Sequence, residues 1–277
     1  MYTKKTHSVG SFFSIITVTL NPGENDLLKT VDSVMAQDFP DWELIIKDGG
    51  STDGSLECLP VDKRIRIVHE KDSGIFDAMN QAVKYARGKF INFLNAGDFF
   101  YDYKALSAVA ETHSRSPEAD FLYGNVHKPY SRSGYELYPS KLSRFYLFKH
   151  MICHQAWFVR NHIYEKVGRY ETNYKTGADY RYLLKMLYRY GVPYQRISRV
   201  VVAYKGSGIS QINQNKKVAK EWVNELRLDL FGVHQCLIFS ILWEIRDILK
   251  KTFYDGLLFV IWKVAQKWRV NIMQYKK

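Results

Sequence analysis

The chain has 277 residues, of which 46% are hydrophobic and 15% aromatic, a composition that supports a packed core and excludes general disorder. Its three cysteines form no C-x-x-C pair, which argues against a disulfide framework or a zinc site, and no apolar run reaches the ~18 residues of a membrane-spanning helix, which favours a cytoplasmic protein. The net charge of +12 is unevenly distributed along the chain, with −5 over residues 1–120 and +17 over residues 121–277. The excess of positive charge predicts an anionic partner.

Strand-like and helix-like segments alternate through residues 13–126. The apolar run 13–19 is β-branched and is followed by NPGEND, without a small-residue cleavage site, so it predicts a buried strand rather than a signal peptide. Further strands are expected at 43–47, 64–69, 90–94 and 121–126, and helices at 26–37, 74–87 and 103–113. This alternation predicts an α/β fold with a doubly wound, mostly parallel sheet.

The second half of the chain is basic and less regular. The segments expected there are a helix at 178–190, a strand at 195–204 and helices from 216 to the end. We therefore expect a main domain over 1–212 and a helical extension over 213–277. The extension is rich in Trp and Lys, a pattern of helices that lie in anionic membrane interfaces. Helices that pack on the main domain or on a second subunit would show the same pattern.

Polar side chains follow four of the expected strands, at the point where each strand ends. They are Asn21, Asp48, Asp72 and the stretch NAGD at 95–98. In doubly wound sheets, ligands bind beyond the carboxyl ends of the strands. The sequence therefore predicts a binding site at this edge.

Asp48 opens the glycine-rich loop DGGSTDGS. Its carboxylate can accept an N–H from a uracil ring, and Gly49 and Gly50 let the backbone approach a ligand closely. A turn in which Ser51 and Asp53 satisfy local amides explains the loop equally well. The loop contains no G-x-G-x-x-G and no G-K-[ST], so a dinucleotide site gains little support and a nucleotide-hydrolase P-loop is excluded.

Asp98 follows the most hydrophobic of the expected strands. A carboxylate in such surroundings is costly unless it binds something. A hard divalent ion such as Mg²⁺ or Mn²⁺, bridging two phosphates, would satisfy it. The alternative is a cap at the start of the next helix.

Two long strings, IITVTLNPGENDLLKTVDSVMAQDFPDWELIIKDGGSTDGS and HEKDSGIFDAMNQAVKYARGKFINFLNAGD, resemble the inverting family 2 glycosyltransferases, which have the Rossmann-like GT-A fold. The resemblance continues through FLYGNV, CHQAWFVR and TGADYRYLLKM and covers about residues 13–210. Within that family, the string DSGIFDAMN resembles the bacterial branch that builds capsule, exopolysaccharide and colanic-acid-type repeat units. The resemblance implies a metal-dependent hexosyl- or N-acetylhexosaminyltransferase that moves a sugar from a UDP-sugar to a lipid-linked or growing glycan.

The resemblance also implies a role for each polar strand end. The residues implied to bind the donor nucleotide are Thr19, Asn21, Asp48, Asp72, Ser73 and Gly74. Those implied to lie at the donor sugar are Asp77, Asn80 and Asn95, and those near the acceptor and diphosphate are His154, Gln155, Lys205 and Ser207. Asp98 is the single carboxylate at the DXD position, where it would hold Mn²⁺ or Mg²⁺ together with diphosphate oxygens and water. The second of the family's two adjacent aspartates is replaced by Gly49.

Asp179 matches the family's catalytic base, which deprotonates the acceptor hydroxyl in a single inverting displacement. The residues support this role independently. No Asp or Glu occurs between Asp179 and Glu221, while that interval holds nine Lys or Arg, and the expected helix N-terminus also favours an ionised carboxylate. The alternative is a helix N-cap.

Two other functions compete with this interpretation. A nucleotidyltransferase acting on a sugar phosphate would use a similar nucleotide fold and release pyrophosphate. A basic, non-enzymatic nucleic-acid module rests on charge alone, because no zinc finger or RNA-binding aromatic motif is present. The leading prediction is an enzyme that binds a nucleotide sugar and a polyprenyl-diphosphate-linked acceptor at the inner face of the plasma membrane, and that binds no nucleic acid.

Overall fold

The computed structural model describes residues 11–129, 134–174, 176–206, 232, 234–250 and 252. The chain divides into two compact units, Met1–Leu226 and Arg227–Lys277. In the second unit, residues 234–250 form a helix, within the stretch where a helical pattern is expected. The expected domain boundary at 212/213 and the site residue Ser207 lie outside the described residues. Within those ranges, no helix has both the length and the apolar character needed to cross a bilayer.

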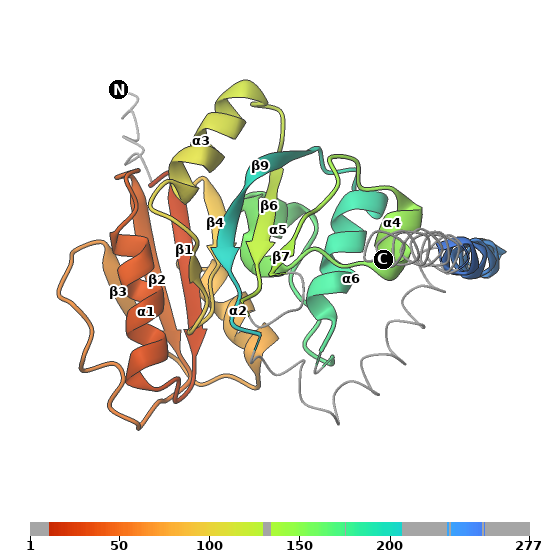
Figure 1. Ribbon diagram of the computed structural model, residues 1–277. Helices are drawn as coiled ribbons and strands as arrows, with labels where there is room; N and C mark the ends of the chain where they lie inside the picture. Colours follow the sequence, from red (N-terminus) through yellow and green to blue (C-terminus); the bar gives the residue numbers. More distant parts are fainter. Residues whose placement is uncertain are drawn as a thin grey trace, which may run out of the picture. The chain divides into compact units, whose positions relative to one another are not determined.

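A nine-stranded sheet organises the first unit (Figure 1), in the order β3-β2-β1-β4-β8-β6-β9-β5, with β7 paired to β6. The strands are β1 Phe13–Thr19, β2 Trp42–Asp48, β3 Ile65–His69, β4 Phe90–Phe93, β5 Phe99–Phe100, β6 Phe121–His127, β7 Tyr135–Glu136, β8 Trp157–Arg160 and β9 Tyr194–Ala203. The first four strands run parallel, which confirms the expected α/β sheet. The rest of the sheet is mixed, because β8 is antiparallel to both β4 and β6, while β9 is parallel to β6.

The helices labelled in the first unit are α1 Glu24–Met35, α2 Ile75–Val83, α3 Ala105–Arg115, α4 Arg144–Lys149, α5 Ile163–Lys166 and α6 Ala178–Leu184. Helices α1, α2, α3 and α6 lie where the sequence predicts helices, and α1 and α2 connect strands of the parallel part of the sheet. In α1 the buried residues Leu27, Val31 and Val34 recur at helical spacing, which gives the helix one apolar face. Helix α2 contacts β1 and β2, and α3 contacts β9. Helices α1, α2 and α3 are therefore held by an apolar face against the sheet.

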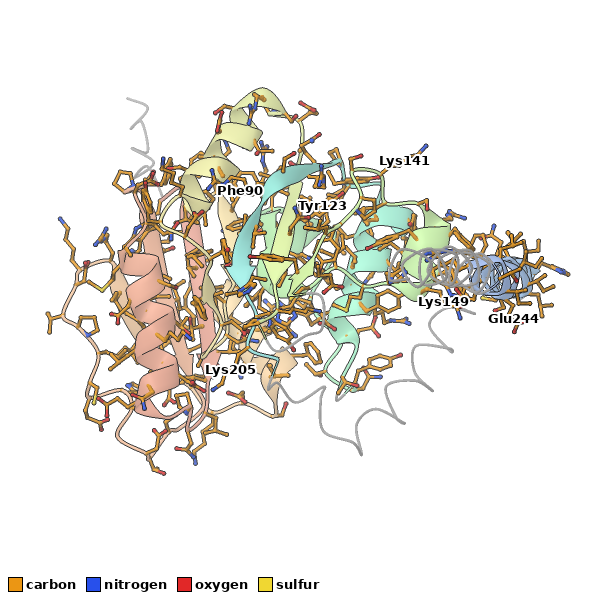
Figure 2. All side chains as sticks on the ribbon, in the orientation of Figure 1. Phe90, Tyr123, Lys141, Lys149, Lys205 and Glu244 are labelled. Carbon is orange, nitrogen blue, oxygen red and sulfur yellow. The ribbon has the colours of Figure 1, made fainter. Side chains whose placement is uncertain are left out.

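The centre of the sheet forms the core. Strands β1 and β2 are buried along their whole length, as expected for parallel strands covered on both faces. Phe90 of β4 and Tyr123 of β6 are fully buried, and both lie in the interior of the first unit (Figure 2). This rigid centre carries the loops at its carboxyl edge.

The region between 127 and 178 contains elements that the sequence pattern does not predict. Strands β7 and β8 and helices α4 and α5 have 2, 4, 6 and 4 residues, which is too short for periodicity to be visible. Two expected helices also end early. After Val83 the chain continues in i→i−3 hydrogen bonds, and after Leu184 it forms a π-type turn over Lys185–Arg189.

The carboxyl ends of β1, β2 and β4 meet at one edge of the sheet, the lower edge in Figure 1. The amide of Gly49, just after β2, donates to the carbonyl of Thr19 at 2.9 Å. The amide of Leu94, just after β4, donates to the carbonyl of Ile16 in β1 at 2.9 Å. The loops that follow these strands are therefore held side by side, as predicted.

Candidate active site

A cavity of about 360 Å³ lies at this carboxyl edge. Its walls come from six parts of the chain: the segment from the end of β1 to the start of α1, the start of α2, the loop after β4, the short 3₁₀ turn η1 (His154–Ala156), the start of α6 and Tyr204 just after β9. The predicted site residues that line it are Thr19, Asn95, Asp98, His154, Gln155 and Asp179. The structure therefore brings the predicted metal residue and the predicted base to one cavity.

Asp98 is 5% exposed and its carboxylate oxygens accept from two donors. The amide of Lys205 donates to Oδ1 and Nε2 of Gln155 donates to Oδ2, each at 2.8 Å. Burial raises the pKa of Asp98 to about 6, although the hydrogen bonds from Lys205 and Gln155 act to lower it. The Lys205 side chain is held separately, by an ion pair of 2.7 Å with Asp26 of α1.

Cys153 sets the orientation of Gln155. Its thiol donates to Oε1 of Gln155 at 2.8 Å. Burial raises the pKa of this thiol, so it remains protonated and able to donate. With Oε1 engaged, the amide nitrogen of Gln155 must face Asp98. The sequence pattern gives no role to Cys153, and only its position beside the motif HQ could have suggested one.

Asp179 lies in the first turn of α6 rather than at its N-cap. The N-cap is Gly177, in the left-handed conformation with φ 84°, and it makes no side-chain cap hydrogen bond. Oδ2 of Asp179 lies 3.1 Å from Nδ1 of His154, and Oδ1 accepts from the amide of Tyr180 at 2.9 Å. The alternative interpretation of Asp179 as a helix cap is therefore not what the structure shows.

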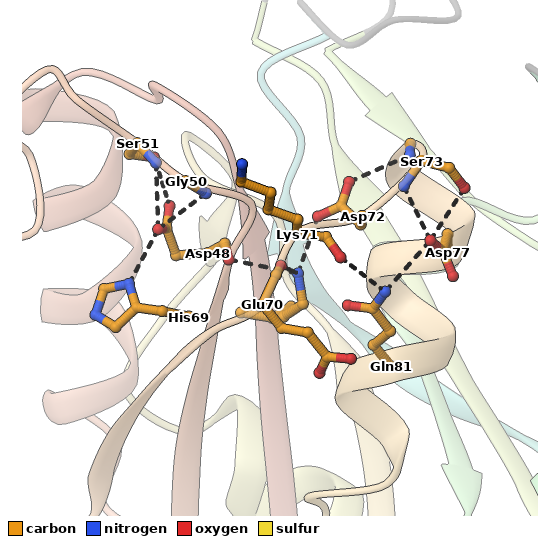
Figure 3. Close-up of polar contacts among 12 residues, drawn as sticks. Asp48, Gly50, Ser51, His69, Glu70, Lys71, Asp72, Ser73, Asp77 and Gln81 are labelled. Carbon is orange, nitrogen blue, oxygen red and sulfur yellow. Dashed lines mark hydrogen bonds and ion pairs between the residues drawn. The ribbon is translucent and has the colours of Figure 1, made fainter.

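Asp48 organises the loop after β2, as Figure 3 shows. Its carboxylate accepts from the amides of Gly50 and Ser51 and lies 3.1 Å from Nδ1 of His69. Burial alone would raise the pKa of Asp48, yet the hydrogen bonds from Ser51, His69 and Gly50 together hold it below its usual value. Asn21 closes the loop from the other side, accepting from the amide of Thr52 at 2.7 Å.

Asp72 lies next to this loop and is held by a lysine that no sequence motif indicates. Nζ of Lys47 is 2.9 Å from Oδ2 of Asp72, and the Lys47 side chain is fully buried. A Cβ at Gly49 would lie only 2.8 Å from the same oxygen of Asp72. Asp72 therefore occupies the space beside Asp48 that a side chain at position 49 would need.

The remaining predicted donor-binding residues make local contacts. Asp77 accepts from the amide and the hydroxyl of Ser73 at 2.9 and 3.0 Å, and the amide of Gly74 donates to Asp72 (Figure 3). Asn80 points elsewhere, because its side chain exchanges two hydrogen bonds with the backbone of Tyr170. These residues do not line the cavity, and Asn80 has a structural partner instead.

A divalent cation would find few protein ligands here. Among the described residues, no group of three or more His, Cys, Asp or Glu could hold a metal ion. Several oxygen-bearing side chains line the cavity, among them Asp98 and Asn95, and Oδ1 of Asn95 is buried without a hydrogen-bond partner among the described residues. Magnesium commonly binds one or two carboxylates and completes its shell with phosphates and water. The residues present fit a cation that brings its other ligands with a diphosphate.

Comparison with known proteins identifies the family of the chain. Residues 14–177 match the family described as Glycosyl transferase family 2. The chain is 31% identical over 226 residues to a PGL/p-HBAD biosynthesis glycosyltransferase of Mycobacterium tuberculosis, a match that covers 79% of this chain and 86% of that protein. It is 39% identical over 90 residues to the putative teichuronic acid biosynthesis glycosyltransferase TuaG of Bacillus subtilis, covering 31% of this chain and 35% of TuaG.

Solved structures show the same fold. TarS of S. aureus in complex with UDP-GlcNAc superposes with a TM-score of 0.62 at 18% identity, covering 80% of this chain and 69% of that one. The mannosyltransferase PcManGT of Pyrobaculum calidifontis, in complex with GDP-Man and Mn²⁺, superposes with a TM-score of 0.56 at 15% identity, covering 84% and 74%. The fold is that of a GT-A glycosyltransferase. The chain belongs to glycosyltransferase family 2.

Proposed function

We propose that this enzyme transfers a hexosyl or N-acetylhexosaminyl group from a UDP-sugar to a growing glycan or a polyprenyl-diphosphate-linked acceptor, with inversion at the anomeric carbon. The observation that carries the proposal is the pairing of two acids, Asp98 and Asp179, at one cavity beyond the carboxyl ends of β1 and β4. The UDP-GlcNAc complex of the structurally similar TarS supports a UDP-linked donor, and the named relatives act in glycan biosynthesis.

In the proposed reaction Asp179 is the general base. The acceptor oxygen forms a bond to the anomeric carbon as the bond to the diphosphate breaks, and the hydroxyl proton passes to the carboxylate of Asp179. This step requires an ionised Asp179 that faces the cavity, and the carboxylate lies on its wall. Asp48 and Asp72, outside the cavity, would hold the uracil and ribose.

Asp98 and Asn95 would hold a divalent cation at the diphosphate. The cation supplies positive charge to the leaving group. Mn²⁺ in the structurally similar mannosyltransferase supports this assignment, and so does the unpartnered oxygen of Asn95. Asp98 must be ionised to bind a cation, and burial opposes this by raising its pKa to about 6.

The test is a panel of UDP-sugars, first ranked by thermal shift in the presence of Mn²⁺ or Mg²⁺ and then assayed for transfer and for UDP release. A donor that binds the native state raises the melting temperature by mass action. We expect Asp179→Asn to lower transfer by about 10²–10⁴-fold while donor binding persists, and Asp98→Ala to remove the response to metal. Glu111→Gln, on the exposed side of α3, is the matched control. Full activity in both site variants, or release of pyrophosphate from a nucleoside triphosphate, would refute the proposal.

A further inference from the structure

Three side chains from separate segments form a line along the cavity wall. Asn95 follows β4, His154 lies in the turn η1 and Asp179 lies in the first turn of α6. Nδ2 of Asn95 is 3.4 Å from Nε2 of His154, and Nδ1 of His154 is 3.1 Å from Oδ2 of Asp179. The His154 and Asp179 side chains are 15% and 16% exposed, so water competes little for these contacts.

The hydrogen bonds that Asp179 and Asn95 can make determine which ring nitrogen of His154 carries the proton. An ionised carboxylate only accepts hydrogen bonds, so Nδ1 of His154 must carry a proton toward Asp179. The amide nitrogen of Asn95 only donates, so Nε2 must present its lone pair toward it. Both contacts are satisfied by one form of the ring, the neutral imidazole protonated at Nδ1.

Asn95 is also one of the residues that line the cavity. Its Oδ1 is buried and has no hydrogen-bond partner among the described residues. A buried carbonyl oxygen without a partner is costly, and a donor hydroxyl or a cation in the cavity would satisfy it. Occupation of the donor site would therefore fix the Asn95 amide, and through it the ring of His154.

We propose that Asn95 and His154 are positioning residues that hold Asp179 as a base and connect its orientation to occupation of the donor site. The inference rests on the proposed role of Asp179. His154 neither gains nor loses a proton in this scheme: the acceptor proton moves to Asp179, and the imidazole donates one hydrogen bond throughout. The turn η1 thereby serves both acids, because Gln155 contacts Asp98 while His154 contacts Asp179.

The first test needs no substrate. Long-range ¹⁵N–¹H correlation spectra of the full-length protein at pH 8, with the His154 signals assigned from their loss in His154→Gln, report which ring nitrogen carries the proton. We expect the proton on Nδ1 in the wild type, because Nδ1 faces the carboxylate of Asp179. An Nε2-protonated ring in the wild type would overturn the proposal.

The second test separates positioning from binding. We expect His154→Ala to lower kcat by roughly 10-fold to 100-fold, a part of what a positioned base contributes, while the Kd for UDP and the donor KM stay within about twofold. His154→Asn should recover most of the lost kcat, because its amide nitrogen can replace Nδ1 as the donor. His69→Ala is the matched comparison, since His69 contacts Asp48 through the same atoms at the same 3.1 Å, and it should raise the Kd for UDP instead.

The two proposals fail in different ways. If Asp179→Asn keeps full transfer activity, the proposed function of Asp179 is wrong, whatever His154 does. If Asp179→Asn is inactive but His154→Ala is fully active, or if its loss lies in donor KM, only the positioning role is wrong. Failure of His154→Asn to recover kcat, with the protein folded by thermal melting, would also contradict it.

Discussion

Asp48 is subject to two opposed effects, and hydrogen bonding wins. Its side chain is 2% exposed, and burial disfavours the charged form. Its oxygens nevertheless accept from two backbone amides and contact His69, so that the pKa falls below the usual value. A carboxylate satisfied in this way holds the loop after β2 in shape before any nucleotide arrives.

This lowered pKa predicts how the stability of the protein depends on pH. A carboxyl group whose pKa is lower in the folded than in the unfolded state stabilises the fold above the unfolded value of about 4, and this contribution is lost as pH falls through the folded value. We expect Asp48→Asn to lower the free energy of unfolding by about 1–3 kcal/mol at pH 7, because charge-assisted hydrogen bonds become neutral ones.

Urea unfolding between pH 7 and pH 3 measures the free energy of unfolding of the wild type and of Asp48→Asn. The difference between the two isolates the effect of Asp48, because other acids, such as Asp62 with its pKa of about 2, are present in both proteins. The difference should shrink below about pH 4. Asp41→Asn, at an exposed position, should show no such difference. A gap between wild type and Asp48→Asn that stays constant down to pH 3 would contradict the assignment.

At the scale of elements, Asn80 fastens helix α2 to the segment before α6. Its Nδ2 donates to the carbonyl of Tyr170 at 2.8 Å and its Oδ1 accepts from the amide of Tyr170 at 2.9 Å. Asn80 is 7% exposed and Tyr170 is 4% exposed. Both backbone groups of Tyr170 therefore depend on one side chain, which indicates a structural role rather than contact with the donor sugar.

We expect Asn80→Ala to lower the free energy of unfolding by about 2–4 kcal/mol, because it leaves two buried backbone groups without partners. Chemical denaturation measures the loss, and Lys84→Ala, on the exposed side of the chain just after α2, is the control. The donor KM, measured where the variant is folded, should be unchanged. An increased KM with unchanged stability would restore the role at the donor sugar that the family resemblance implies.

The elements also show what the sequence can predict here. Long apolar β-branched runs identify β1 and β2, and polar residues at their carboxyl ends identify Asp48 and the start of the cavity. The turn η1 is different. Its residues act through contacts with Asp98 and Asp179, which lie 57 and 25 positions away from their partners in the chain. No local pattern encodes such contacts, because they depend on how the short antiparallel strand β8 enters the sheet.

The burial of Lys47 is another feature that the local sequence does not predict. A lysine inside an apolar strand is expected to point to solvent, yet this one is fully buried and bound to Asp72. The partner that makes its burial tolerable follows a different strand, β3. The family resemblance identifies Asp72 as a site residue but gives no reason for its position, which the ion pair to Lys47 supplies.

At the scale of the whole molecule, the second unit combines a positive net charge with exposed apolar side chains. Residues 227–277 carry a net charge of +5 and three tryptophans. The described helix at 234–250 exposes large apolar side chains at helical spacing; they are Leu237, Ile238, Ile241, Leu242, Ile245, Ile248 and Leu249, each 47–63% exposed. An apolar stripe on a basic unit suits the surface of an anionic membrane, where a lipid-linked acceptor would lie.

We therefore predict that the full-length protein binds vesicles containing phosphatidylglycerol and that raising the salt concentration weakens this binding. Replacing Ile241 and Ile245 together by Ser should weaken vesicle binding by at least about 10-fold in sedimentation assays, because each buried isoleucine contributes about 1.5–3 kcal/mol. Asp247→Asn, a change of one polar residue on the same helix, is the control and should bind at least as well as the wild type. If the double variant binds vesicles normally but changes from dimer to monomer in gel filtration, the stripe joins two copies of the chain and the membrane assignment is wrong. Activity on a short, water-soluble acceptor should be equal in both variants, because none of the three residues lines the cavity.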